Sequence, residues 1–296
     1  MEALKPFKTL EEQITHLKSA HGLIIIDEER AKTELSWINY YRLSAYGISL
    51  RDPANKDQYR AGTTFDDIVS LYYFDQVLRT YLALPISDIE VHLRTEVAYC
   101  LGKEYGPEGY VCCNNFQQDT NPKTGVLRHQ ELMNKLHDEM VRQSQAPCVK
   151  HHMDKYGGHF PIWAAIELFT FGNVVSLLSI MSPKDQATVA AAFQTDYKHL
   201  YSWMLSLLEI RNICAHGNRI YNMPLKQSPR LYKEHAKYGK TNKVFPAILV
   251  IKRLMSGQKS WNVLAGALAE YIPEQPSVDI RCLGFPAEWK TVLEIS

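Results

Sequence analysis

Apolar residues recur at every third or fourth position along most of this chain, which is the period of an α-helix with one buried face. A first stripe near the N-terminus consists of Leu10, Ile14 and Leu17. It follows a capping box that begins at Thr9, and it stops at Gly22. No segment sustains the alternating pattern of a β-strand, and no segment repeats another. The pattern therefore predicts an all-α fold.

Capping residues and prolines locate the other helices that we expect. Asp27, Thr64 and Ser182 each stand as an N-cap before an apolar stripe, and Pro183 occupies the first helical position after Ser182. Pro85 should break or kink the helix that starts at Thr64, because proline lacks the backbone N–H that a helix interior needs. The expected helices cover residues 9–22, 27–47, 64–85, 86–106, 126–145, 160–181, 182–193, 197–217, 245–255 and 260–271.

The clearest loop of the chain is "GPEGYVCCNNFQQDTNPKTG", which is rich in Gly, Pro and Asn. It separates the expected helices into two groups. We therefore expect an N-terminal helical region at residues 1–106, a boundary loop at residues 107–125 and a second helical region at residues 126–296.

Composition narrows the kinds of partner that the protein can have. Of the 296 residues 46% are hydrophobic, enough to bury a large core, and the net charge is only +1, so a nucleic-acid site would have to be a local basic patch. The N-terminus has no apolar signal segment and no apolar run could span a membrane, so we expect a cytoplasmic protein without a membrane partner. The six cysteines form no CxxC pair and match no zinc spacing with the histidines, which predicts free thiols, no metal and no cofactor.

The stretch "EIRNICAHGNRIYN" (Glu209–Asn222) places polar residues at the end of an apolar helix. Arg211, Asn212 and His216 lie there, and Gly217 can end the helix in a left-handed conformation. Histidine moves protons near neutral pH and arginine holds phosphate oxygens bidentately, which suits metal-independent RNA cleavage through the 2′-hydroxyl. Asn212, one turn from His216, could orient its ring or contact the phosphate. A helix end whose basic side chains complement the helix dipole would look the same, so the spacing alone does not decide.

One Arg–His pair supplies too few groups for both proton transfers of such a cleavage. Two copies that face each other across a two-fold axis would suit the chemistry better. A second pair, Arg230 and His235, lacks the asparagine and lies in a polar segment, so we give it no catalytic role.

The next segment, "LKQSPRLYKEHAKYGKTNK" (Leu225–Lys243), carries six Lys and Arg residues against one acid, with two tyrosines among them. Such a patch could follow a phosphate backbone while its tyrosines stack on bases, and the alternative is a solvated, mobile loop. The RNA contacts that we expect are Arg219, Lys226, Arg230, Tyr232, Lys233, Lys237, Tyr238, Lys240 and Lys243.

Several stretches resemble known families. "RNICAHGNRIYN" is similar to the R-N-x-x-x-H signature of HEPN-domain ribonucleases. The Abi family of bacterial abortive-infection proteins, of the AbiD/AbiF type, is resembled in collinear order by "INYYRLSAY", "GTTFDDIVSLYYFDQVLR", "IEVHLRTEVAY", "PIWAAIELFTFG" and "LGFPAEWK". The resemblance implies a HEPN-like helical bundle with an additional helical N-terminal region. It also implies a toxin-like ribonuclease of phage defence, with Arg211, Asn212 and His216 as its catalytic residues. Because the chain has one credible copy of the motif, the resemblance further implies a homodimer with a composite active site.

Two further questions stay open in the sequence. A toxin-like ribonuclease needs restraint, and the basic segment makes a structured non-coding RNA a candidate antitoxin. A non-catalytic HEPN-type module that binds RNA or a protein, and a purely structural helical scaffold, are the alternatives to an enzyme. The binding module would have no need for a titratable histidine at position 216, and the polar end of the helix argues weakly against the scaffold.

Five other residues carry weaker expectations. We expect Tyr40 and Tyr41 to pack rather than to contact RNA, and the sequence assigns no role to Arg42. Arg94 and Glu167 are charges on mostly apolar helices, so we expect them to form a buried ion pair, with an approach to the active site as the alternative.

Overall fold

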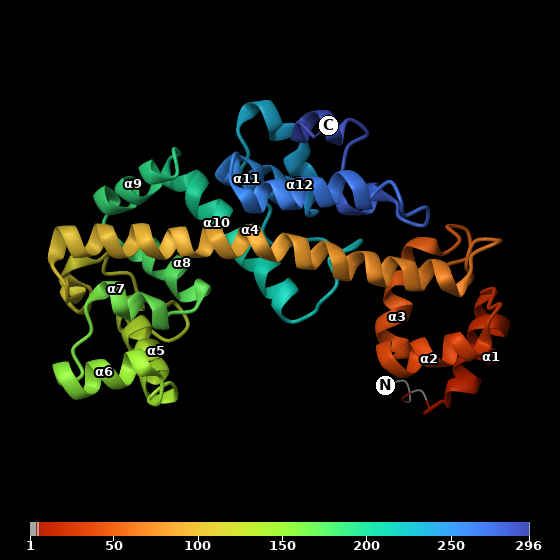
Figure 1. Ribbon diagram of the computed structural model, residues 1–296, viewed down its shortest axis with the longest axis horizontal. Helices are drawn as coiled ribbons and strands as arrows, with labels where there is room; N and C mark the ends of the chain where they lie inside the picture. The colour runs from red at the N-terminus through yellow and green to blue at the C-terminus, as the bar shows by residue number, and fades with distance from the viewer. Residues whose placement is uncertain (1–3, 5, 296) are drawn as a thin grey trace.

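The longest helix, α4 (Phe65–Tyr105), runs along the length of the molecule and organises the rest of the fold (Figure 1). At a rise of 1.5 Å per residue it spans about 60 Å. The computed structural model describes residue 4 and residues 6–295. Within this range the chain is all-α, since its extended segments form only isolated β-bridges. The all-α fold that the sequence predicts is therefore confirmed.

The other helices lie around α4. Figure 1 shows α1 to α3 at one end of α4, α5 to α7 at the other, and α11 and α12 over its middle. No helix within residues 6–295 is long and apolar enough to cross a membrane. The α-helices besides α4 are α1 (Leu10–His21), α2 (Glu28–Ile38), α3 (Tyr40–Tyr46), α5 (Arg128–Arg142), α6 (Pro147–Tyr156), α7 (Ile162–Ala165), α8 (Phe171–Ile180), α9 (Pro183–Ala192), α10 (Tyr197–Ala215), α11 (Phe245–Met255), α12 (Lys259–Tyr271) and α13 (Trp289–Leu293). The 3₁₀ turns are η1 (Gly47–Leu50), η2 (Gly109–Val111), η3 (Cys113–Asn115), η4 (Ile166–Leu168), η5 (Lys233–Thr241) and η6 (Ile280–Leu283).

The expected helix caps are confirmed. The side chains of Thr9, Asp27, Thr64 and Ser182 each accept a hydrogen bond from a backbone N–H of the first turn that follows. Gly22 ends α1 with a φ of +67°, a conformation that a residue without a Cβ adopts at little cost. Caps depend on a few neighbouring residues, and for this reason the sequence locates these helix ends well.

Pro85 lies inside α4 without ending it, so of the break or kink expected there, the break is absent. Its missing N–H removes one helical hydrogen bond, the one to the carbonyl of Tyr81. The side chains of Leu82 and Ile86 on either side of the proline are fully buried, so tertiary packing compensates for the lost bond.

Two other expected helices are interrupted. The one expected at residues 27–47 divides at Asn39, whose φ is +68° and whose side-chain oxygen accepts a hydrogen bond from the backbone N–H of Tyr41 at 2.8 Å. The one expected at residues 160–181 divides into α7, η4 and α8, because Thr170 caps a new helix through the backbone N–H of Asn173. Helix α6 has no counterpart among the expected helices. At Asn39 and Thr170 a polar residue that can cap a helix lies within an apolar run, and the apolar periodicity alone does not reveal the break.

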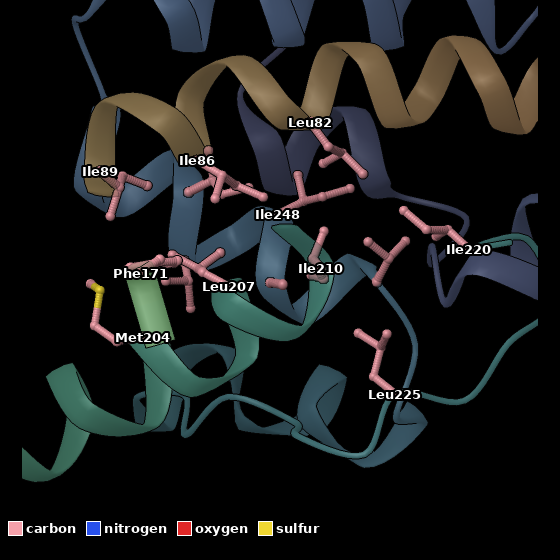
Figure 2. Packing of buried hydrophobic residues seen from close by; sticks show 14 of the residues in the cluster. Leu82, Ile86, Ile89, Phe171, Met204, Leu207, Ile210, Ile220, Leu225 and Ile248 are labelled. Atoms are coloured by element: carbon pink, nitrogen blue, oxygen red, sulfur yellow. The ribbon is translucent and has the colours of Figure 1, made fainter. Parts of the chain in front are cut away.

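The two helical regions expected from the sequence, residues 1–106 and 126–296, pack against each other. Between α4 and α5 the chain forms the short 3₁₀ turns η2 and η3 and two isolated β-bridges, while α4 itself packs against α10, α11 and α12. The division into two regions thus stays a prediction. Figure 2 shows the core at this contact, where buried side chains of α4, α8, α10 and α11 gather between the helices. The labelled members are Leu82, Ile86, Ile89, Phe171, Met204, Leu207, Ile210, Ile220, Leu225 and Ile248.

Candidate functional site

The polar stretch after α10 is held in a defined turn. His216 is the C-cap of the helix, and Gly217 follows with a φ of +62°. The backbone N–H of Gly217 donates to the carbonyl of Cys214 at 3.2 Å, and that of Asn218 donates to the carbonyl of Ile213 at 2.9 Å. These two bonds form a Schellman motif, which satisfies the last carbonyls of the helix. The left-handed cap expected at Gly217 is confirmed, and it fixes the backbone on both sides of His216.

Arg211 points into a cavity between α4 and the end of α10, which we call the α4–α10 groove. The cavity has a volume of about 650 Å³. Its floor along α4 contains the small side chains of Thr80, Ala83 and Ser87, which leave room beside the two helices. The lining residues are Gln76, Arg79, Thr80, Ala83, Ser87, Glu90, Arg94, Arg211, Cys214 and Ala215.

Three arginines and a single carboxylate give the groove a positive charge. One oxygen of Glu90 lies 2.6 Å from Nη2 of Arg94, and the other lies 3.3 Å from Nε of Arg211. Arg94 also donates to the carbonyl of Phe169 at 3.0 Å, while its buried Nε has no hydrogen-bond partner among the described residues. Because two cations share Glu90, the groove retains uncompensated positive charge that an anion could neutralise.

The third arginine, Arg79, is bound to the buried carboxylate of Asp75. Its Nε donates to Asp75 at 3.2 Å. Asp75 also accepts hydrogen bonds from the hydroxyl of Tyr46 at 2.8 Å and from the backbone N–H groups of Ile220 and Tyr221 at 3.1 and 2.7 Å. Burial raises the pKa of Asp75, and these hydrogen bonds act in the opposite direction. One carboxylate thus joins α3, α4 and the segment that follows His216.

Helix α3 holds the same segment from the other side. Nη1 of Arg42 donates to the carbonyl of Gly217 at 2.5 Å, and Nη1 of Arg219 donates to the carbonyl of Ala45. Arg219, which the sequence predicts as an RNA contact, is half-buried and instead holds the turn against α3. The sequence assigned no role to Arg42, and its contact with Gly217 places it beside the motif.

Asn212 and His216 lie outside the groove lining. Both side chains are exposed. The backbone of His216 passes between Ala215, which lines the groove, and Gly217, which lies beside Arg79: a Cβ built on Gly217 would lie 3.5 Å from Nη1 of Arg79. His216 therefore stands at the edge of the groove, while Arg211 enters it one to two turns earlier along α10.

The nearby thiol does not compete as a nucleophile. Burial raises the pKa of Cys214 to about 12, so this cysteine stays protonated near neutral pH. Within residues 6–295, His, Cys, Asp and Glu side chains form no group of three that could hold a metal ion.

The tyrosines of the basic segment are engaged in packing. Tyr238 is only 8% exposed, and its ring packs edge-on against Phe245. Tyr232 shares a hydrogen bond with Thr195 at 2.7 Å and stacks on His199 at a centroid distance of 4.3 Å. Neither ring is free to stack on a base in this structure.

The cations of the same segment divide into two classes. Lys237 lies 3.2 Å from Glu288, and Nζ of Lys243 donates to Asn222 at 3.3 Å. The remaining four are exposed, and within the described chain their side chains form no ion pair. They are Lys226, Arg230, Lys233 and Lys240.

Two expectations about single residues are wrong. Arg94 does not pair with Glu167, which is exposed. It pairs with Glu90, one turn away on the same helix.

Tyr41 is 86% exposed and so does not pack in the core, whereas Tyr40 is half-buried. Tyr41 turns outward because α3 restarts at Asn39 and sets a new helical face.

Asp75, Arg79 and Glu90 were not among the site residues predicted from the sequence. A signal was present: Asp75 with Arg79, and Glu90 with Arg94, are acid–arginine pairs four residues apart on a mostly apolar helix. Charges at such positions are buried only when they are paired, so each pair marks a polar contact on the inner side of the helix.

Of three comparisons with known proteins, one found a match. No curated protein and no solved structure matches the chain. A family model described as Abi-like protein matches residues 33–222. The matched range contains α3, α4 and α10, and with them every residue of the groove and the turn after His216. The chain belongs to the family of Abi-like proteins.

Proposed function

We propose that this protein is a metal-independent endoribonuclease that acts as a toxin-like effector in abortive infection, with Arg211 and His216 in its active site. Family membership supports the link to abortive infection. The observation that carries the enzymatic part is the position of Arg211. It enters a groove that contains two further arginines, and His216 stands at the edge of that groove.

The cleavage needs two proton transfers and no change of oxidation state. The 2′-hydroxyl of the RNA loses its proton to a base, and its oxygen attacks the adjacent phosphorus. The bond from phosphorus to the 5′-oxygen then breaks, and an acid protonates that oxygen. The products are a 2′,3′-cyclic phosphate and a 5′-hydroxyl. Histidine can serve as the base or the acid, and arginine holds the phosphate oxygens as their charge increases.

A second copy of the chain would complete the acid–base set. Each chain brings one His216 at an exposed helix end, and the reaction uses one base and one acid. We therefore include in the proposal a homodimer in which two His216 side chains face each other across a two-fold axis. Asn212, which is exposed one turn before His216, would contact the phosphate or the partner's ring.

We further propose that RNA restrains the enzyme, bound along the basic segment at residues 225–243. The exposed cations Lys226, Arg230, Lys233 and Lys240 support a phosphate contact there. The tyrosines of this segment are left out of the proposal because their rings are packed.

The test compares histidine variants on an end-labelled single-stranded RNA. His216→Ala and Arg211→Ala should each lower the cleavage rate by about 100-fold or more. The matched control is His235→Ala, which removes the histidine of the other Arg–His pair and should cleave like the wild type. Cleavage should persist in EDTA, and a 2′-deoxyribose at the scission point should block it.

Two outcomes would overturn this function. Cleavage close to the wild-type rate by both His216→Ala and Arg211→Ala would show that the site lies elsewhere. A wild-type protein that binds the RNA tightly and never cuts it would favour the non-catalytic binding module instead.

A further inference from the structure

The segment "YYFDQVLR" on α4 carries a buried charge pair that the proposed reaction has not used. Asp75 is fully buried and Arg79 is 8% exposed. Removing two charges from water is costly unless their hydrogen bonds are well made. A hydrophobic pair of similar size would serve the core at least as well, so the charges need another explanation.

The guanidinium of Arg79 is bound along one edge and open along the other. Its Nε donates to Asp75 at 3.2 Å, whereas neither Nη atom makes a hydrogen bond with another described residue. Arg79 lines the α4–α10 groove, and its Nη1 lies 3.5 Å from the position of a Cβ on Gly217, the residue after His216. The free donors therefore lie in the groove, at the end where His216 stands.

Asp75 fixes the same end of the groove through the backbone. It accepts the N–H groups of Ile220 and Tyr221, which follow His216 by four and five residues, in addition to holding Arg79. A single carboxylate thus sets the distance between the guanidinium of Arg79 and the turn that carries His216.

We propose that Arg79 is a second phosphate-binding catalytic residue of this site, and that Asp75 is the residue that positions it. The inference rests on the ribonuclease function proposed above. Arg79 donates hydrogen bonds from its Nη atoms to the non-bridging oxygens of the scissile phosphate, and no bond to Arg79 itself forms or breaks. As the 2′-oxygen attacks and the bond to the 5′-oxygen lengthens, negative charge increases on these oxygens and the hydrogen bonds strengthen.

Arg94 is a weaker candidate for this role, although it lines the same groove. It lies fifteen residues further along α4, which is about 22 Å at 1.5 Å per residue. Its guanidinium is also held by Glu90 and by the carbonyl of Phe169. Of these two arginines, Arg79 alone combines free Nη donors with a position beside His216.

The experiment measures kcat, KM and melting temperature for Arg79→Lys, which keeps the charge and the pairing with Asp75 but loses the planar fork. We expect kcat to fall by about 100-fold. Binding of an uncleavable RNA with 2′-deoxyribose at the scission point should weaken less than threefold, and the melting temperature should change little. The control is Arg142→Lys, an exposed arginine on α5 that pairs with Glu139 and should be neutral in every measurement.

A second variant keeps the proposal testable if Arg79→Lys does not fold. The double substitution Asp75→Asn with Arg79→Gln replaces the ion pair by a neutral pair of similar shape, and the same loss of kcat is expected. Free guanidinium ion added to this variant should restore part of the activity, because it can occupy the empty donor position. A purely structural role would give no such rescue.

The outcomes separate this inference from the function on which it rests. If His216→Ala abolishes cleavage while Arg79→Lys cleaves at the wild-type rate, the ribonuclease stands and the role of Arg79 is refuted. If kcat is unchanged and only RNA binding weakens, Arg79 binds substrate without catalysing, which also overturns the proposal. If His216→Ala itself cleaves normally, the proposed function fails first.

Discussion

Helix α4 carries two acid–arginine pairs with the same four-residue spacing, Asp75 with Arg79 and Glu90 with Arg94, and their surroundings differ. Asp75 contacts four groups: a tyrosine hydroxyl, two backbone N–H groups and Arg79. Among the described residues, the polar contacts of the Glu90 carboxylate are with two guanidinium groups, those of Arg94 and Arg211. The first carboxylate joins parts of the fold, and the second, only 7% exposed, lies between two cations in the lining of the α4–α10 groove.

The difference teaches that spacing on a helix does not fix the role of an ion pair. Both pairs satisfy the i,i+4 rule, which by itself contributes only about 0.2–0.5 kcal/mol on an exposed helix. What decides the role is what else each carboxylate touches. Asp75 accepts from the backbone N–H groups of Ile220 and Tyr221, which have no other hydrogen-bond acceptor among the described residues, so its loss would leave them without one. Glu90 occupies the place where a phosphate would be attracted, so its loss would free cations.

The largest expected effect is a loss of folding stability on removal of the Asp75 carboxylate. Asp75→Ala should lower the free energy of unfolding by about 3–5 kcal/mol, because it leaves the buried Arg79 without its partner. Glu90→Ala should lower the free energy of unfolding by clearly less than Asp75→Ala. Its partners Arg94 and Arg211 line the groove, where solvent can replace the lost carboxylate. Denaturant unfolding of the two variants beside the wild type measures both. Equal losses would break the distinction between the two pairs.

Glu90→Gln should change RNA affinity, and here we expect a gain and not a loss. The glutamine keeps the shape of the side chain and removes the negative charge that competes with phosphate. Single-stranded RNA should therefore bind about tenfold more tightly, which corresponds to about 1.4 kcal/mol. Glu96→Gln on the same helix, next to His92, is the control and should leave affinity unchanged. Weaker binding by Glu90→Gln would mean that this carboxylate orients Arg211 instead of competing with the ligand.

How far the sequence predicts this molecule depends on how local each feature is. The N-caps at Thr9, Asp27, Thr64 and Ser182 and the left-handed turn at Gly217 involve neighbours within a few positions, and all are present. The uninterrupted course of α4 past Pro85 depends on tertiary packing, which a local rule for proline does not include.

The candidate site shows the same limit. The sequence locates Arg211 and His216 at a helix end, and it draws attention to Arg94. It pairs Arg94 with the wrong acid, because Glu167 lies on an apolar segment whose breaks at η4 and Thr170 are not visible from periodicity. Asp75 and Arg79 reach the site only through the crossing of α4 and α10. That crossing is a long-range contact, and no spacing within either helix reveals it.

The smallest effect is expected for Lys233, a cation without a carboxylate partner among the described residues. Lys233 is exposed and forms no ion pair within the described chain, whereas Lys237, one turn later, lies 3.2 Å from Glu288. If RNA follows this segment, Lys233→Gln should weaken binding about twofold and reduce the slope of log affinity against log salt by about 0.7, the value for one phosphate contact on a single strand. Lys237→Gln should change the slope less, because Glu288 already neutralises that lysine.

The measurement is a salt titration of RNA binding by the wild type and both variants. Equal slopes for all three proteins would place the phosphate contacts elsewhere, and the α4–α10 groove would then account for the RNA affinity without the basic segment.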